Sequence, residues 1–403
     1  MANSVVLTSG REMKINIKVL LFISLILLTI ILFFSKSKSI IESEDRAASA
    51  SLTNEVSEFL DSRSELGRRL GRDTPYLSEN EGSVARKALS EADFRDLAES
   101  LGNYGVFDRN MAINKFKEHA LDKESLDAIF SGLGRLSSDH TSFSTLVAAL
   151  AAVGTPEIQE RLRYLLEQRD SDWRAFAAII PAFAFLQQPT PQTIEFLFER
   201  SRHPDPDFSS TAALALGAVV RTLRVKGETS GTTLLQLQID KIKDPSSRVE
   251  DVRGALAVLG NAGLPETEEL IVSLLSTDDP SLRADAALAL RFMSSSSSEK
   301  ALLARLEIEE DLDTRMTIIE ALLHRPVSAL GLAAIRTLMS AVPPAPHELR
   351  EKALELFFHS ELSESEKIMN SEWLKSMIAA EPASSVKKKM NDTLQMLSRP
   401  SYQ

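Results

Sequence analysis

Two ten-residue stretches, DVRGALAVLG at residues 251–260 and SLRADAALAL at residues 281–290, decide the fold of this chain. In each, an arginine is followed three and six residues later by apolar positions, and the pattern recurs at residues 172–181, 313–322 and 348–357. This spacing places the apolar positions on one face of a helix. The sequence therefore predicts similar helices repeated along the chain.

The distance between these helices indicates a repeat fold. Their arginines, together with Ser210 in the equivalent place of a sixth stretch, lie 30 to 43 residues apart. Breaker residues and a further apolar-periodic segment follow the stretches, so each unit should be a pair of helices joined by a turn. Units of this size bury their apolar faces by stacking on one another. We expect an all-α structure without a β-sheet.

The pattern resembles HEAT repeats across about residues 142–360. That family typically has an Asp just ahead of the first helix of a pair and an Arg inside it. The matching residues here are Asp170 with Arg174, Asp279 with Arg283, and Asp311 with Arg315. The resemblance implies a right-handed α-solenoid in which the three arginines lie near acidic side chains or carbonyls of adjacent pairs. The unit of Arg253 departs from the pattern, because Val249 stands where the acid should be.

A narrower resemblance covers residues 208–293. The succession FSSTAALALGAVVRTLR, GALAVLGNAGLPETEELIVSLL and SLRADAALALRFM is similar to the helical domain of vitellogenin-type large lipid-transfer proteins. In that family β-sheets beside the helical domain form the lipid cavity, and no segment here alternates like a strand for long. The resemblance therefore implies the helical fold more than lipid carriage. Lipid transfer or lipoprotein handling remains the alternative function.

The N-terminal segment predicts a membrane anchor. Val19–Phe34 has no charged residue, and counted from Ile15 the segment reaches twenty residues, enough to span a bilayer. A cleaved signal peptide is the rival interpretation, but the small residues at Ala48–Ala50 lie too far beyond the apolar core for ordinary processing. Basic residues favour a cytoplasmic N-terminus. We expect a single-pass protein of a bacterial inner membrane with its helical repeat in the periplasm; Met13 is an alternative start.

The chain should divide into five parts. These are a tail at 1–14, a transmembrane anchor at 15–35, a polar linker at 36–89, the helical repeat at 90–376, and a C-terminal helix and tail at 377–403. The linker is rich in Ser, Glu, Asp and Arg, as a solvated segment should be. One helix is expected inside it, from the apolar stripe of Leu52, Val56, Phe59, Leu60, Leu66 and Leu70.

Composition argues against several functions. The net charge of −11 disfavours binding to nucleic acid phosphates. The absence of cysteine excludes disulfides, thiolate metal sites and a cysteine nucleophile. The six histidines are scattered, and the motifs of phosphate-binding loops, serine hydrolases, zinc proteases and dinucleotide-binding folds are missing. We therefore expect no catalytic residue, no cofactor and no metal site.

A scaffold that binds a protein partner of unknown identity is the function that the sequence favours. Such a solenoid usually binds partners on its concave side, lined by the second helix of each pair. The polar positions that the core leaves over on two such helices are Gln192, Glu195, Glu199, Glu266 and Glu269. They suggest an acidic stripe for a basic or polar partner.

Overall fold

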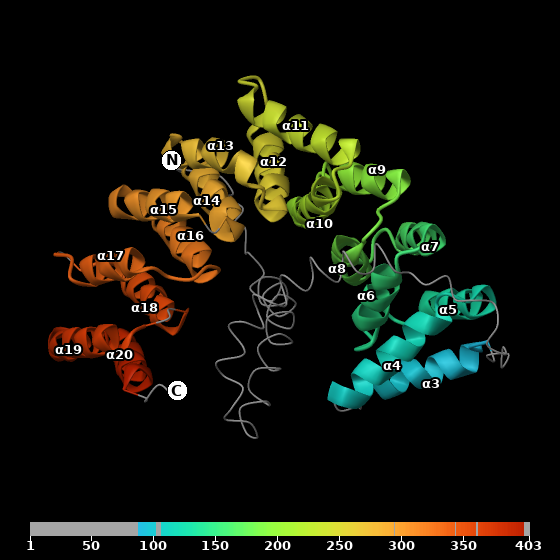
Figure 1. Cartoon of the computed structure of the whole chain (residues 1–403), viewed down its shortest axis with the longest axis horizontal. Coiled ribbons are helices and arrows are strands. Elements are labelled where there is room, and N and C mark those ends of the chain that lie inside the picture. Colours follow the sequence, from blue (N-terminus) through green and yellow to red (C-terminus); the bar gives the residue numbers. More distant parts are fainter. Residues whose placement is uncertain (1–87, 102–105, 294, 343, 360–361, 399–403) are drawn as a thin grey trace, which may run out of the picture. The chain divides into compact units, whose positions relative to one another are not determined.

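The computed structural model describes residues 88–101, 106–293, 295–342, 344–359 and 362–398, and in these ranges the chain forms helices and no strand (Figure 1). The predicted all-α repeat is confirmed. The anchor predicted at 15–35 and the linker helix predicted around Leu52–Leu70 lie outside the described residues.

The helices follow one another with short connections. The odd-numbered helices are α3 (Glu91–Leu101), α5 (Lys123–Arg135), α7 (Pro156–Glu167), α9 (Pro191–Arg200), α11 (Thr229–Lys243), α13 (Glu268–Ser273), α15 (Ser296–Ile308), α17 (Ala329–Met339) and α19 (Glu364–Ala380). The even-numbered helices are α4 (Val106–His119), α6 (Phe143–Val153), α8 (Trp173–Ala182), α10 (Pro206–Val225), α12 (Val249–Ala262), α14 (Pro280–Ala289), α16 (Leu312–Leu323), α18 (His347–Glu355) and α20 (Ser384–Leu397). Five short 3-10 segments extend or precede some of them: η1 (Phe183–Phe185), η2 (Pro265–Thr267), η3 (Leu274–Ser276), η4 (Leu290–Phe292) and η5 (Leu356–His359). The domain boundary predicted at residue 376 falls inside α19.

Alternate helices pack against one another. From α4 to α20, every even-numbered helix contacts the next even-numbered one, and α7 with α9, α13 with α15 and α15 with α17 do the same in the odd-numbered set. The order can be followed in Figure 1. Contacts of this kind, made between neighbours in a series, are those of a stacked repeat.

Side-chain caps fix where several of the helices begin. An aspartate whose side chain accepts backbone N–H groups of the first turn precedes the even-numbered α8, α10, α14 and α16; the four are Asp172, Asp205, Asp279 and Asp311. Among the odd-numbered helices, α7 and α9 each have a threonine cap followed by proline, Thr155–Pro156 and Thr190–Pro191. Such caps satisfy orphan amides and fix where each helix starts.

Odd-numbered helices pack chiefly on the even-numbered helix that follows them. This holds for α13 with α14, α15 with α16, α17 with α18, and α19 with α20, while α11 contacts both of its neighbours. The helix with the Asp cap and the Arg is therefore the second helix of each pair. The sequence interpretation made it the first, which was wrong by one helix. Breaker residues stand on both sides of the Arg-bearing helix, so the sequence does not show which turn closes the pair.

Small residues set the spacing between successive even-numbered helices. Gly260 of α12 faces Ala289 of α14 so closely that a Cβ added to the glycine would lie 2.5 Å from the alanine Cα. Gly254, in the same helix, has nothing within 4 Å of such a Cβ. The close contact between α12 and α14 therefore requires glycine at position 260, whereas position 254 could hold a larger residue.

Within the described residues, α10 is the helix that is long and apolar enough to cross a membrane. It packs against α8, α9, α11 and α12, and its Ala212, Leu216 and Val219 are buried. A core helix of this kind passes the same test of length and composition, so its apolar sequence is explained by the packing.

Candidate functional site

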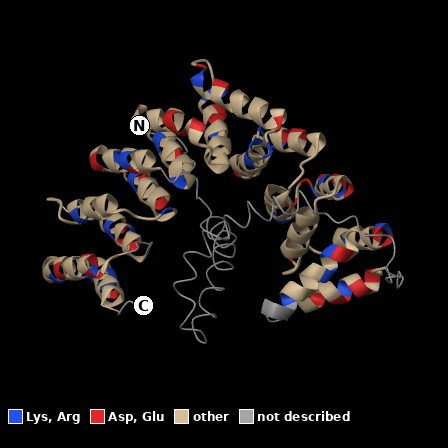
Figure 2. Ribbon diagram, in the orientation of Figure 1, with Lys and Arg blue, Asp and Glu red and all other residues tan. Residues whose placement is uncertain are grey.

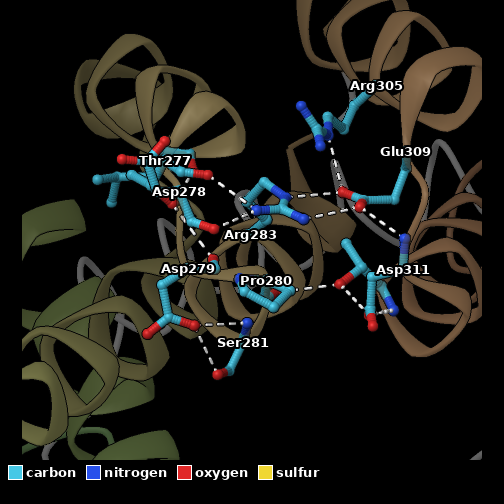
Figure 3. Close-up of polar contacts among 11 residues, drawn as sticks. Thr277, Asp278, Asp279, Pro280, Ser281, Arg283, Arg305, Glu309 and Asp311 are labelled. Carbon is cyan, nitrogen blue, oxygen red and sulfur yellow. Dashed lines mark hydrogen bonds and ion pairs between the residues drawn. The ribbon is translucent and has the colours of Figure 1, made fainter.

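A buried arginine joins two successive pairs. Arg283, in the first turn of α14, is 8% exposed. Its Nε and Nη2 each donate to a carboxylate oxygen of Glu309 at 2.7 Å, while Nη1 donates to the carbonyl oxygens of Thr277 at 2.9 Å and Asp278 at 2.8 Å. Figure 3 shows the guanidinium between the segment before α14 and the segment before α16. We call Arg283 and Glu309 the first joint.

Glu309 receives further donors besides Arg283. The Nε of Arg305 donates to it at 2.8 Å and the backbone N–H of Asp311 at 3.0 Å (Figure 3). Hydrogen bonds from Arg283 hold the pKa of Glu309 far below its usual value, and they outweigh the opposing effect of burial. A buried ion pair is stable only when such additional hydrogen bonds satisfy it. The carboxylate is therefore charged and occupied, which suits a structural role.

The same arrangement occurs a second time, between α18 and α20. Arg350, 5% exposed, forms an ion pair with the buried Glu381, and its Nε donates to the carbonyl oxygen of Ala345 at 2.9 Å. Glu381 also accepts the backbone N–H of Ala383 at 2.8 Å, two residues further on, as Glu309 does from Asp311. We call Arg350 and Glu381 the second joint. Both joints tie one even-numbered helix to the segment that begins the next.

Two more repeat arginines reach the neighbouring unit through exposed contacts. Arg174 of α8 pairs with Asp139, before α6, and Arg253 of α12 pairs with Asp285 of α14 at 2.5 Å. Their side chains are 59% and 51% exposed, respectively. Arg253 thus has a partner in the neighbouring helix although Val249 replaces the expected acid.

Arg315 differs from the other repeat arginines. In the described part of the chain its buried Nε has no hydrogen-bond partner. Burial lowers the pKa of Arg315, and only the charge of Glu309 opposes that shift. The predicted proximity to acids or carbonyls is therefore met by ion pairs at Arg174 and Arg283. No ion pair of Arg315 is seen among the described residues, and only the charge of Glu309 acts on it.

The aspartates that precede these arginines have other partners than those expected. Asp279 accepts the backbone N–H of Ser281 at 2.8 Å and Asp311 that of Thr314 at 2.8 Å. Asp170 accepts a hydrogen bond from Arg200 at 2.7 Å. An aspartate at the start of a helix finds its nearest donors in the free amides of that helix. The carboxylates of the joints come instead from Glu309 and Glu381, which the sequence interpretation missed.

The predicted partner-binding residues are all exposed, and they lie on α9 or on the segment formed by η2 and α13. Gln192, Glu195 and Glu199 lie on α9, Glu266 in η2 and Glu269 on α13. Glu266 is engaged by Arg224 of α10 at 2.8 Å, and this hydrogen bond lowers its pKa. In the structure, α9 and α13 are the first helices of their pairs. The residues were chosen because second helices usually line the concave side, and that reason no longer applies to them. Their role in binding stays a prediction.

A cationic cluster was not anticipated. The guanidinium carbon of Arg202 lies 4.0 Å from the centroid of the Phe198 ring, and Nζ of Lys241 lies 5.2 Å from the same centroid. Phe198 belongs to α9 and Lys241 to α11. We call these three residues the Phe198 cluster. Arg202 follows Phe198 by four residues, but Lys241 is distant in sequence and belongs to no motif, so only its contact with Phe198 in the folded chain reveals the cluster.

Charge is unevenly spread over the helices. Figure 2 shows Asp, Glu, Lys and Arg on most of the described helices, while α6, with the sequence FSTLVAALAAV, has none.

Across the described ranges, no group of three or more His, Asp or Glu side chains is placed to hold a metal ion.

A hollow beside α3, α4 and α5 bears on the lipid alternative. Its lining combines apolar and charged side chains, among them Leu89, Leu97, Met111, Phe116, Leu121, Asp93, Asp96, Lys115, Glu118 and His119. A pocket for acyl chains would be predominantly apolar. The lining is apolar in part and charged in part, so the hollow does not decide between a lipid and a protein ligand, and lipid handling stays a prediction.

Comparison with known protein families finds a match for part of the helical repeat. Residues 235–323 match the family model of HEAT repeats. The match begins in α11 and ends with α16. It therefore contains three pairs of helices, α11 with α12, α13 with α14, and α15 with α16, and each pair ends with an even-numbered helix, as in the structure. The described part of the chain is thus a HEAT-like helical repeat. The resemblance of residues 208–293 to vitellogenin-type proteins stays a prediction.

Other comparisons add little. No curated protein matches the chain. A solved structure of human deoxyhypusine hydroxylase in complex with glycerol is similar at 16% sequence identity, covering 76% of this chain and 96% of that chain with a TM-score of 0.27. A similarity of this size carries no argument about activity.

Proposed function

We propose that this chain is a membrane-anchored, non-catalytic scaffold whose helical repeat binds a protein partner. The observation that carries the proposal is a set of exposed carboxylates. Glu195 and Glu199 of α9 and Glu269 of α13 are exposed, and none of the three has an ion-pair partner among the described residues. Many other acidic side chains of the repeat are paired with arginine or lysine. Carboxylates left unneutralised on a rigid surface favour a basic partner.

The joints support a scaffold role, because a surface binds well when its parts are held in fixed positions. Each joint fixes an even-numbered helix to the start of the next through a buried ion pair. The faces that remain exposed are then presented at constant spacing. We propose that the stack is right-handed, as in the HEAT repeats it resembles.

The anchor belongs to the same proposal. A helix from about Ile15 to Phe34 would span the inner membrane, with residues 1–14 in the cytoplasm and the repeat in the periplasm. Lysines flank the apolar segment on both sides and can extend their ammonium groups to the lipid headgroups.

A crosslinking pull-down from native membranes tests the partner proposal. We would compare the full-length wild type with the triple variant Glu195→Lys, Glu199→Lys, Glu269→Lys, and with Asp313→Lys, which reverses an exposed charge on α16. The expected result is a discrete crosslinked partner that the triple variant loses and Asp313→Lys retains. Equal capture by all three proteins, or no partner with the wild type, would refute the proposal.

A further inference from the structure

The Phe198 cluster places two cations on one aromatic ring. Arg202 lies 4.0 Å from the ring centroid and Lys241 5.2 Å from it. Attraction between a cation and the π face stabilises each contact. It does not remove the repulsion between the two positive charges, which a bound anion would offset.

One carboxylate beside the cluster is already engaged by another arginine. Asp251, in the first turn of α12, attracts both Lys241 and Arg202, but it forms a two-pronged contact with Arg248, with Oδ2 2.9 Å from Nε and Oδ1 3.3 Å from Nη2. Burial lowers the pKa of Lys241, and the charge of Arg202 lowers it further. In the described part of the chain, Asp251 is thus shared among three cations.

Arg202 is exposed and Lys241 is half-buried, so a ligand can reach the guanidinium from solvent. Arginine offers a planar fork and lysine a point charge, and both donate to carboxylates. The half-buried Phe198 ring supplies an apolar contact beside them. The chemistry of the cluster is therefore that of a receptor for an acidic side chain with a carbon stem.

We infer that the Phe198 cluster binds a carboxylate of an acidic segment on the protein partner. This inference rests on the proposed scaffold function and gives the scaffold a second contact, opposite in charge to Glu195 and Glu199 of α9, the helix that also carries Phe198. The partner surface would then carry both charges, basic opposite those glutamates and acidic opposite Arg202. A carboxylate of a protein is favoured over a phosphate polymer or an anionic lipid surface, because the net charge of −11 and Asp251 beside the cluster repel a dense array of negative charges more strongly than one carboxylate.

Binding can be measured with a model ligand. A fluorescein-labelled hexaglutamate peptide would be titrated into the full-length chain in non-ionic detergent at low salt and followed by fluorescence anisotropy, with hexaglutamine and hexalysine as control peptides. The variant Arg202→Gln with Lys241→Gln removes the cluster, and Lys243→Gln removes one exposed charge from the same end of α11. Melting by circular dichroism confirms that both variants fold.

The inference predicts that the double variant binds hexaglutamate at least about tenfold more weakly than the wild type, and that Lys243→Gln binds it as the wild type does. NMR of 13C-labelled lysine side chains should show that the peptide raises the pKa of Lys241, because a bound carboxylate favours the charged amine. Equal binding by the wild type and the double variant would overturn the inference. So would binding to phosphatidylglycerol vesicles without binding to the peptide. The crosslinking result with Glu195→Lys is independent of these outcomes, so the scaffold proposal can stand if the cluster fails.

Discussion

At the scale of single residues, the repeat depends on carboxylates that lie just ahead of an even-numbered helix. Glu309 gathers donors from Arg283, Arg305 and the N–H of Asp311, and Glu381 does the same for Arg350 and Ala383. Each carboxylate holds a helix of the previous pair and the backbone of the next. Removing one of them would leave a buried guanidinium without its counter-charge.

The first prediction concerns the first joint. Glu309→Gln should destabilise the protein by about 3 kcal/mol, because the amide retains some hydrogen bonds but leaves Arg283 uncompensated. Glu310→Gln, at the exposed neighbouring position, should change stability by less than about 0.5 kcal/mol. Urea unfolding of the full-length chain, followed by circular dichroism, measures both. Equal midpoints for the two variants would show that the joint contributes nothing.

The second prediction concerns acid. The pKa of Glu309 is lower in the folded state than in the unfolded chain, so its stabilisation is complete above about pH 4.3 and is lost as the pH falls further. The stability difference between the wild type and Glu309→Gln should therefore shrink between pH 5 and pH 3. Urea midpoints of both proteins across this range give the difference. A gap that stays constant down to pH 3 would contradict the lowered pKa.

Some residue roles could be predicted from the sequence and others could not. The arginines were located by their spacing, and Arg174 and Arg283 do reach neighbouring pairs. Their partners were not found, because Asp279 and Asp311 satisfy their own helices. Glu309 and Glu381 stand 26 and 31 residues beyond their arginines, and no fixed spacing distinguishes them from the other glutamates of the sequence.

At the scale of helices, the periodic spacing of apolar residues and the capping residues predict where helices form. They do not predict which helices form a pair. The turns on both sides of an Arg-bearing helix contain Gly, Pro, Ser or Asp, so either could close a pair. Packing decides between them, since α13 lies on α14 and α15 on α16. Helix-to-helix contact is a property of surfaces brought together in space, which local sequence signals do not encode.

The third prediction tests this packing with two glycines of α12. Gly260→Ala should destabilise the protein by about 1–3 kcal/mol, because its Cβ would collide with the backbone of Ala289. Gly254→Ala should stabilise it by up to about 1 kcal/mol, because alanine favours a helix and the added Cβ meets nothing within 4 Å. Thermal melts of the two variants should move in opposite directions. Stabilisation by Gly260→Ala would show that α12 and α14 do not approach as closely as described.

At the scale of the whole molecule, the scaffold proposal requires the repeat to be held at a membrane on the side where its partner is found. The sequence supplies this expectation through the apolar segment Val19–Phe34 and its flanking lysines. Anchoring also limits which proteins the exposed carboxylates of α9 and α13 can meet. The side of the membrane therefore decides the class of partner.

A protease protection experiment measures directly on which side of the membrane the repeat lies. Protease added to intact spheroplasts should digest the repeat, while an epitope within residues 1–14 stays protected and the protein in untreated cells remains in the carbonate-washed membrane fraction. The account predicts both results, because the segment from Ile15 to Phe34 is expected to stay uncleaved with its N-terminus in the cytoplasm. Protection of the repeat from protease would reverse the orientation, and a soluble mature chain beginning near Ser51 would contradict the membrane-anchored scaffold.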